Sequence, residues 1–414
     1  MDIFKGLAAG TAFAILAGSA AHADCGIAAG NISVLANDFP ALRAVVDKAA
    51  ECAGGDVTFS TNHTAEHRDI QVAALTADPA EYTTVVVANS SIVPLLNDGL
   101  IRPLDDLVSK HGQHLKKNQL ITIDGKVMAI AFMANAQHLV VRNDILQQVG
   151  LEFPSTYEEV LAAAKAIRDA GIMEHPFAML TKSDWNLGEE FVNMYLGHGG
   201  QFFKPGTAEP NVRNETGVAT LNMLKSLAEY SNPDFLTYNT ATVAPIWEAG
   251  NLAMAQMWGS SVGQLLDDEG STAEVIENTV PLGAMTVAGG SSPASSLWWD
   301  GFTIATNISD EDAEATFIAM VHGISDEMVM EGDNNDKAVW LMDAFRPGPA
   351  AKGISATASA GAQPYPMLPY MGLLHSAFSA ELPDFLQGGE SAEQTLADIE
   401  AAYITSAKES GFLQ

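Results

Sequence analysis

The segment 126–167 constrains the fold of this chain more than any other part of the sequence. An apolar run at Val127–Met133 is interrupted at Ala134 and Asn135, and a second strand-like run follows at once at His138–Val141. Two such runs, separated by only a few small and polar residues, predict one strand that continues from one sheet into another. A chain with such a strand is expected to form two lobes joined by a crossing.

A helix is predicted shortly after this double strand. Pro154 keeps the residue before it extended, and Thr156 can cap a helix whose Glu159, three residues later, bonds back in a capping box. Apolar residues recur at helical spacing from Val160 to Ile167. This spacing predicts that one face of the helix is buried.

The first 23 residues have the pattern of a secretory signal peptide. Lys5 gives a weakly basic start, residues 6–18 are apolar but too short to span a bilayer, and Ala21–Ala23 forms an A-x-A cleavage site. We therefore expect cleavage after Ala23 and a mature periplasmic protein that begins at Asp24. No other stretch reaches 18 apolar residues, so no transmembrane helix is expected.

The length and charge of the chain limit its classes of partner. With 414 residues the chain is long enough for two lobes. Its formal net charge of −31 repels nucleic acid and anionic membranes, so neither is an expected partner. The charge is interpreted as a device for solubility in a secreted protein. An acidic cleft for a cationic substrate is the alternative interpretation.

The two cysteines of the sequence, Cys25 and Cys52, both lie near the start of the mature chain. In an oxidising compartment an even pair predicts one disulfide. The bond would tie the new N-terminus to the first helix, and a metal-binding or catalytic role is not expected of these residues.

Strands and helices alternate after the cysteines. Strands are predicted at 32–35, 56–60 and 84–88 and a helix at 41–50. In open α/β sheets, ligands lie beyond the carboxyl ends of the strands. This rule nominates as ligand-binding residues Asn37, Asp38, Thr61, Asn62, His63, Asn89 and Ser90. Asx turns and helix caps explain each of these residues equally well.

Several short motifs resemble those of the family 1 extracellular solute-binding proteins, the carbohydrate-binding subunits of ABC importers, which include maltose-binding protein. After the predicted crossing, Asn143–Glu159 contains "N-D-hydrophobic" and "G-x-x-x-P-x-T-aromatic-E-E". Gly99–Asp106 is similar to "G-L-[IL]-x-P-L-[DT]-[DE]", and Trp247–Met254 to "F-x-x-G-[KN]-x-A-M" with Trp in the aromatic position. The motifs occur in the family's order along nearly the whole mature chain.

The resemblance implies a type II periplasmic binding protein fold of the α/β class, with two lobes joined by a multi-strand hinge. It places residues 24–134 and 288–333 in the N-lobe, and residues 135–287 and 334–414 in the C-lobe. A strand expected at Pro281–Val287 precedes a small-residue return crossing. The implied protein is a monomer without catalytic activity, metal or cofactor, which closes on a sugar-like solute and delivers it to a membrane permease.

Sugar binding requires aromatic platforms and polar groups that match hydroxyls. Four of the six tryptophans lie at predicted strand ends or inter-lobe segments, beside polar residues, although large aromatic residues also fill cores. Arg346 is one of few cations in the C-terminal region, where it either binds an anionic group or offsets the acidic surface. The further ligand-binding candidates are Asn135, Asp184, Trp185, Trp258, Ser260, Trp298, Trp299, Asp300 and Arg346.

Two motifs suggest enzymatic or metal-binding alternatives. Gly259–Gly263 fits the G-x-S-x-G nucleophile elbow, in which Ser261 would use Asp300 with either His322 or His375. A helix N-terminus that contacts ligand oxygens explains the same residues, and the resemblance favours it. His63–His67 fits the zinc pattern H-x-x-E-H, which a solvated helix start also produces. No phosphate-binding Walker A motif is present, so ATP hydrolysis by this chain is not expected.

Overall fold

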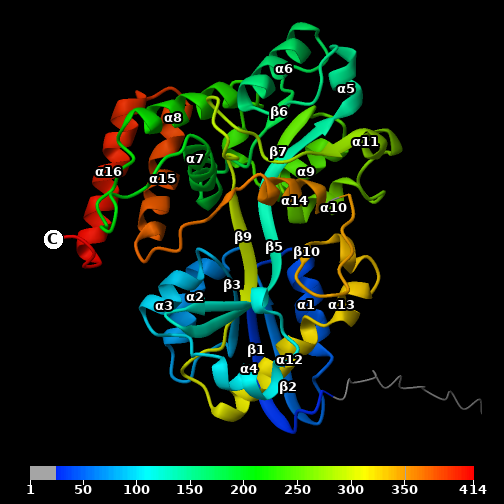
Figure 1. The fold of residues 1–414 in the computed structure, drawn as a ribbon, viewed down its shortest axis with the longest axis vertical. Coiled ribbons are helices and arrows are strands. Elements are labelled where there is room, and N and C mark those ends of the chain that lie inside the picture. The colour runs from blue at the N-terminus through cyan, green and yellow to red at the C-terminus, as the bar shows by residue number, and fades with distance from the viewer. Residues whose placement is uncertain (1–24, 350) are drawn as a thin grey trace, which may run out of the picture.

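The computed structural model describes residues 25–349 and 351–414 of the protein. Figure 1 shows two lobes, one above the other, with strands β5 (Lys126–Arg142) and β9 (Ser296–Phe302) running between them. The predicted signal peptide and its cleavage site lie outside the described residues. No helix within the described part is long and apolar enough to cross a bilayer.

Strand β5 confirms the prediction of one strand shared by two sheets. It is a single strand of 17 residues. Its first half pairs with β4, β9 and β10, and its second half pairs with β7 and β8. Both apolar runs of the sequence are buried along it, because each half crosses the middle of a lobe. The predicted α/β architecture of two lobes with a multi-strand hinge is confirmed.

The first lobe is built on a sheet in which β1 pairs in parallel with β2 and β3, and β3 pairs antiparallel with β9. Its other elements are β1 (Ala29–Ala36), α1 (Pro40–Ala50), β2 (Asp56–His63), α2 (His67–Thr76), β3 (Thr84–Ala88), α3 (Ile92–Asn97), α4 (Asp105–His111), η1 (Lys117–Gln119), β4 (Leu120–Ile123), α12 (Asp310–Gly323), α13 (Asp326–Met330), η4 (Asn334–Asp336) and β10 (Val339–Trp340). The predicted strands and first helix of this lobe are therefore confirmed.

The second lobe surrounds the other half of β5 with helices. Its elements are α5 (Asn143–Gln148), α6 (Tyr157–Asp169), β6 (Phe177–Ala178), α7 (Trp185–Gly197), α8 (Glu215–Ala228), η2 (Phe235–Thr237), α9 (Thr240–Glu248), β7 (Met254–Trp258), η3 (Gly259–Ser261), α10 (Val262–Leu265), α11 (Ala273–Asn278), β8 (Thr279–Pro281), α14 (Ala351–Ser359), β11 (Gln363–Pro364), α15 (Met371–Leu386) and α16 (Ala392–Glu409). The strand predicted at 281–287 is wrong beyond Pro281, because β8 ends there.

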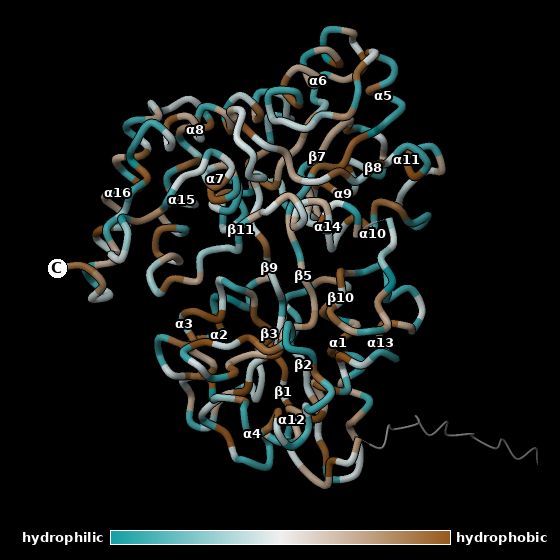
Figure 2. Tube along the Cα trace, in the orientation of Figure 1, coloured by the Kyte–Doolittle hydropathy of each residue, from teal (hydrophilic) through white to brown (hydrophobic). Residues whose placement is uncertain are grey.

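Each lobe has its own apolar core, visible as brown segments inside both halves of Figure 2. Trp298 packs in the core of the second lobe, whereas Phe302 packs in that of the first, so the chain crosses along β9. Trp340 and Met342 also pack in the first lobe, so the last crossing lies between β10 and α14. The packing therefore puts these two crossings later than the expected boundaries after residues 287 and 333.

The start of α6 forms one of the two hydrogen bonds of the predicted capping box. Thr156 Oγ1 accepts a hydrogen bond from the Glu159 backbone N–H at 3.1 Å, as expected of an N-cap. The Glu159 carboxylate, however, accepts from the backbone N–H and hydroxyl of Ser155 at 2.7 and 2.9 Å. The reciprocal bond of the predicted capping box thus goes to the residue before the cap.

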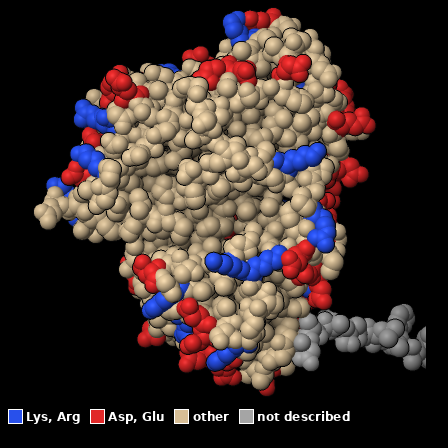
Figure 3. Space-filling model, viewed as in Figure 1, with Lys and Arg blue, Asp and Glu red and all other residues tan. Residues whose placement is uncertain are grey.

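Most acidic side chains on the face shown in Figure 3 lie along the outer edges of the two lobes. A broad central area of the upper lobe carries few charges on this face. This distribution agrees with the interpretation that the charge serves solubility.

The predicted disulfide between Cys25 and Cys52 is confirmed. The two sulfurs are bonded, and 27 positions separate the residues in the sequence. Cys52 follows α1 and is buried in the core of the first lobe, so the bond fixes the start of the described chain to that core.

Removing this crosslink is expected to destabilise the first lobe. A disulfide that closes a loop of this length lowers the entropy of the unfolded chain by an amount worth about 3 kcal/mol. The double variant Cys25→Ser/Cys52→Ser should therefore unfold at lower urea concentration than the wild type without reductant. Equal unfolding midpoints, or two free thiols in the wild type by alkylation and intact mass, would contradict the prediction.

Candidate functional site

Three of the predicted tryptophans meet where the two lobes face each other. Trp185 begins α7, Trp258 ends β7, and Trp298 lies on β9. The rings of Trp185 and Trp258 are stacked with centroids 6.4 Å apart, and Trp298 lies edge-on to them at 5.3 and 5.8 Å. Indoles from three separate elements thus form one cluster, here called the tryptophan cluster, in which Trp185 and Trp258 are partly exposed.

Neighbouring side chains fix the positions of these rings. Trp298 Nε1 donates to Ser296 Oγ at 2.7 Å and to Glu189 Oε1 at 3.2 Å. The ring of His375, on α15, stacks on Trp185 with centroids 4.7 Å apart. This contact requires glycine at position 188, because a Cβ there would lie 2.6 Å from the imidazole of His375. The cluster is therefore rigidly supported from the second lobe.

Arg68 reaches the tryptophan cluster from the first lobe. It lies in the first turn of α2, and its guanidinium carbon is 4.1 Å from the centroid of the Trp185 ring. Such a cation–π contact attracts the two groups. It also means that the two lobes touch at the position where a ligand would meet the Trp185 ring. The sequence analysis missed Arg68, although it lies just beyond the carboxyl end of a strand, where ligand-binding residues are expected.

Two carboxyl groups close to Arg68 have raised pKa values. Burial raises the pKa of Glu189 to about 8, although hydrogen bonds from Ser296 and Trp298 oppose the shift. Burial likewise raises the pKa of Asp300 to about 7, and the positive charge of Arg68 opposes that shift. The predicted candidate Asp300 thus belongs to this site. Near neutral pH both groups can donate a hydrogen bond as well as accept one.

Two predicted amide side chains hold the hinge together. Asn135, on β5, donates to Ser260 Oγ at 2.9 Å and accepts from the Ser260 backbone N–H at 3.2 Å. Asn89 follows β3, donates to the Leu297 carbonyl at 3.2 Å and accepts from the Trp299 backbone N–H at 2.9 Å. Three predicted residues are therefore brought near the crossing strands, where their amide and hydroxyl groups bind the protein itself.

Four predicted residues make local contacts on the first lobe or at the start of a helix. His63 Nδ1 lies 3.0 Å from the carbonyl of Asn37, and Asp38 forms an ion pair with Arg43. Asp184 caps α7 by accepting from the Asn186 backbone N–H at 2.9 Å. These contacts are those of turns and caps, which explain the polar residues without a ligand.

Three further predicted residues have other surroundings. Trp299 is adjacent to Trp298 on β9 and therefore points to the opposite face, where it packs against the first lobe. Arg346 is exposed, and its Nη1 donates to the carbonyls of Asp343 and Phe345 at 2.7 and 2.9 Å. Ser90 has a buried hydroxyl without a hydrogen-bond partner among the described residues.

The surroundings of Ser261 do not favour a hydrolase. Both ring nitrogens of His375 are engaged, with Tyr365 Oη at 3.0 Å and the Trp185 carbonyl at 2.8 Å. His322 lies 3.4 Å from Glu51 in the first lobe. Neither histidine is therefore held by a hydrogen bond to the serine, as the proton transfer of a catalytic triad requires.

The zinc interpretation also lacks support in the structure. His63 ends β2 and His67 begins α2, so they do not share the helix that the motif requires. Among the described residues, the one group of three ligand atoms close enough to share a metal is Cys25, Cys52 and His322, and the disulfide occupies both of its sulfurs.

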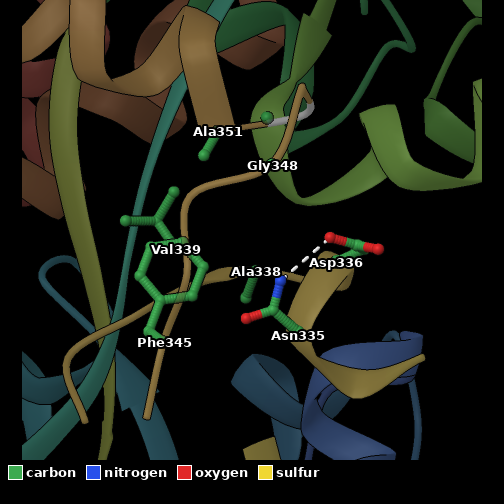
Figure 4. Close-up of a pocket in the computed structure, with 8 residues that line it drawn as sticks. Asn335, Asp336, Ala338, Val339, Phe345, Gly348 and Ala351 are labelled. Carbon is green, nitrogen blue, oxygen red and sulfur yellow. Dashed lines mark hydrogen bonds between the residues drawn. The ribbon is translucent and has the colours of Figure 1, made fainter. Parts of the chain in front are cut away.

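Two cavities that none of the clustered tryptophans lines do not fit a sugar. The cavity of Figure 4, between Gly259 and the segment 335–351, has a volume of about 10 Å³, which holds one water molecule. A second, of about 420 Å³, is an open groove beside α1 that offers no aromatic side chain. Its lysines are already paired with neighbouring carboxylates, as in the ion pair of Lys337 with Asp333.

Comparison with known proteins decides the family. The family of bacterial extracellular solute-binding proteins matches residues 33–340 of the chain. The protein belongs to this family. Its architecture agrees with the family, whose fold and activity are those of solute-binding proteins rather than enzymes.

Two curated relatives of this solute-binding protein match part of its sequence. A polygalacturonan/rhamnogalacturonan-binding protein of Bacillus subtilis (strain 168) is 26% identical over 200 residues, which is 44% of this chain and 39% of the relative. A probable ABC transporter-binding protein of Deinococcus radiodurans is 25% identical over 194 residues, 45% of this chain and 44% of the relative. The chain thus spans less than half the length of the curated relatives it matches.

Solved structures of type II periplasmic binding proteins share the fold of this solute-binding protein. A solute-binding protein of Agrobacterium radiobacter K84 in complex with ribitol has a TM-score of 0.77 and 19% identity, and the match covers 92% of this chain and 98% of the other. Maltose-bound MalE3 of T. maritima has a TM-score of 0.75 and 16% identity. That match covers 91% of this chain and 100% of the other. At these identities the likeness shows the fold.

The raised pKa of Glu189 predicts a specific dependence of stability on pH. Between pH 5 and 8 this carboxyl loses its proton on unfolding but keeps it in the fold, so stability falls as the pH rises. The side chain in Glu189→Gln cannot ionise, so this pH-dependent loss of stability is absent from the variant. As the pH rises from 5 to 8, the free energy of unfolding of this variant should decline less steeply than that of the wild type. The two slopes should differ by up to about 1.4 kcal/mol per pH unit.

The measurement is urea denaturation of both proteins at pH 5, 6, 7 and 8. Glu190, whose pKa burial also raises to about 8, is present in both proteins, and the charge of Glu189 contributes to that shift, so the difference reports on Glu189 together with its coupling to Glu190. Glu409→Gln, which changes an exposed carboxyl, serves as the control and should parallel the wild type. Parallel curves for the wild type and Glu189→Gln would disprove the prediction.

Proposed function

We propose that the protein is the periplasmic solute-binding subunit of an ABC importer, which captures a sugar or polyol between its lobes and delivers it to the membrane permease. The observation that carries this proposal is the tryptophan cluster, which lies where the two lobes meet, so that Arg68 of the first lobe contacts its Trp185 ring. A solute bound there contacts both lobes at once.

The chemistry of the cleft matches a polyhydroxylated molecule. The apolar faces of sugar rings stack on indoles, and their hydroxyls need polar groups around the rim. Trp185 and Trp258 supply partly exposed rings, while Glu189 and Asp300 supply carboxyl groups beside them. Glu189 is buried and Asp300 is half-buried, so a solute that excludes the remaining water strengthens its hydrogen bonds to these groups.

The architecture supports a motion that opens and closes this site. Arg68 touches Trp185 across the cleft, so the lobes must part before a solute can enter. The crossings along β5, along β9 and between β10 and α14 give the lobes a hinge of separate segments. In this proposal the protein acts as a monomer without a cofactor and catalyses no reaction.

The names of the similar proteins support the same class of solute. Among the solved structures, two were determined with the polyols ribitol and D-mannitol, and another with maltose. The signal-peptide pattern at residues 1–23 supports export to the periplasm, where such a subunit meets its solute.

Calorimetric titration with a panel of sugars and polyols tests the proposal, and Trp185→Ala tests the site. Loss of this ring should weaken binding of the best solute by at least ~2 kcal/mol, the usual threshold for an anchor residue. Trp185→Phe, which keeps an aromatic face, should lose less. The unliganded melting temperature of Trp185→Ala should fall less than that of Trp340→Ala, which empties a buried core position.

Two results would refute the site. One is an unchanged affinity of Trp185→Ala for a solute that the wild type binds. The other is that no sugar or polyol in the panel gives a saturable response. This result would reject the proposed class of solute altogether.

A further inference from the structure

Arg68 is a cation at the contact between the lobes that has no polar partner among the described residues. Its Nη1 is buried and has no hydrogen bond, and no carboxylate of the described residues lies within ion-pair distance of its guanidinium. A guanidinium keeps its charge in proteins and presents five N–H donors in a planar fork. A buried donor that remains unpaired costs free energy, which a ligand that accepts its hydrogen bond can restore.

The groups around Arg68 offset its charge only in part. Tyr365, Asp300, Glu189 and Asp69 are close enough to interact with it electrostatically, but no carboxylate among the described residues forms an ion pair with it. Burial raises the pKa values of Tyr365, Asp300 and Glu189, so near neutral pH Glu189 is mainly protonated, Asp300 is partly ionised and Tyr365 is neutral. Arg68 is therefore an incompletely neutralised positive charge at the contact between the lobes.

An unpaired polar group also lies opposite Arg68 on the second lobe. Glu189 Oε2 is buried without a hydrogen-bond partner, although Oε1 of the same side chain accepts bonds from Ser296 and Trp298. A protonated carboxyl at this position can donate to an anionic or hydroxyl oxygen of the same ligand. The two lobes thus each offer one unsatisfied polar group next to the tryptophan cluster.

Resting on the solute-binding function proposed above, we propose that the solute is an acidic sugar, a polyhydroxylated carbon skeleton with a carboxylate that pairs with the guanidinium of Arg68. Arginine binds a carboxylate through two parallel N–H···O bonds, which fixes the orientation of the ligand as well as its charge. The remainder of the solute lies beside the tryptophan cluster, once the lobes have parted and Arg68 has left the Trp185 ring to bind the carboxylate. A cationic solute is the poorer fit, because it would place a second positive charge beside Arg68.

The test compares acidic sugars with neutral counterparts of the same skeleton by calorimetry at pH 7. The probes are D-galacturonate and D-glucuronate with the methyl ester of galacturonate, D-galactose and D-glucose, and D-gluconate with D-sorbitol. The two groups of acids distinguish a uronate from an aldonate. We expect the best acid to bind at least about 10-fold more tightly than its neutral counterpart. This factor corresponds to the free energy that one hydrogen bond to a charged group contributes.

Arg68→Gln should weaken binding of that acid at least about 10-fold, and by a clearly larger factor than it weakens binding of the neutral counterpart. Arg346→Gln makes the same change of charge at an exposed position outside the cleft and should bind like the wild type. Arg68→Lys keeps the charge but loses the planar fork, so its affinity should be intermediate.

The outcomes separate this inference from the proposed function. If a neutral sugar or polyol binds as tightly as its acid, the acidic solute is disproved while sugar binding stands. If Arg68→Gln retains wild-type affinity for the acid, the pairing of the carboxylate with Arg68 is disproved. If no probe binds, the proposed function fails together with the inference. Should Arg68→Gln not fold, the comparison of galacturonate with its methyl ester on the wild type decides, because the ester removes the charge alone.

Discussion

The structure depends on two strands, β5 and β9, that belong to both lobes. Residues Lys126–Arg142 of β5 pair with strands of the first lobe and then with strands of the second without a break in the strand. Because both halves of β5 are buried in separate cores, neither lobe can fold with this strand out of register. The crossing strands therefore fix the relative position of the tryptophan cluster, on one side, and Arg68, on the other.

The cleft combines apolar rings with polar groups that the protein itself satisfies incompletely. Trp298 and Ser296 engage one oxygen of Glu189, whereas its other oxygen and the Nη1 of Arg68 have no partner among the described residues. Elsewhere at the hinge, the amides of Asn89 and Asn135 are used to join crossing segments. This contrast separates groups that build the fold from groups that are available to a solute.

The sequence predicts the local features of this molecule well and the contacts between its lobes poorly. The two apolar runs of β5 and the cap at Thr156 depend on neighbouring residues, so periodicity and capping rules identify them. Trp298 and Trp299 cannot be distinguished in this way, because the face that each occupies depends on how β9 is oriented between the lobes. Arg68 was missed because its role depends on the approach of the second lobe.

The central claim of this account is that solute binds between the lobes and that its binding is coupled to their closure. Small-angle X-ray scattering of the wild type, with and without a saturating solute identified by calorimetry, tests the claim most directly. The account predicts a smaller radius of gyration in the presence of the solute, because the lobes close around it. An unchanged radius at full saturation would contradict the account.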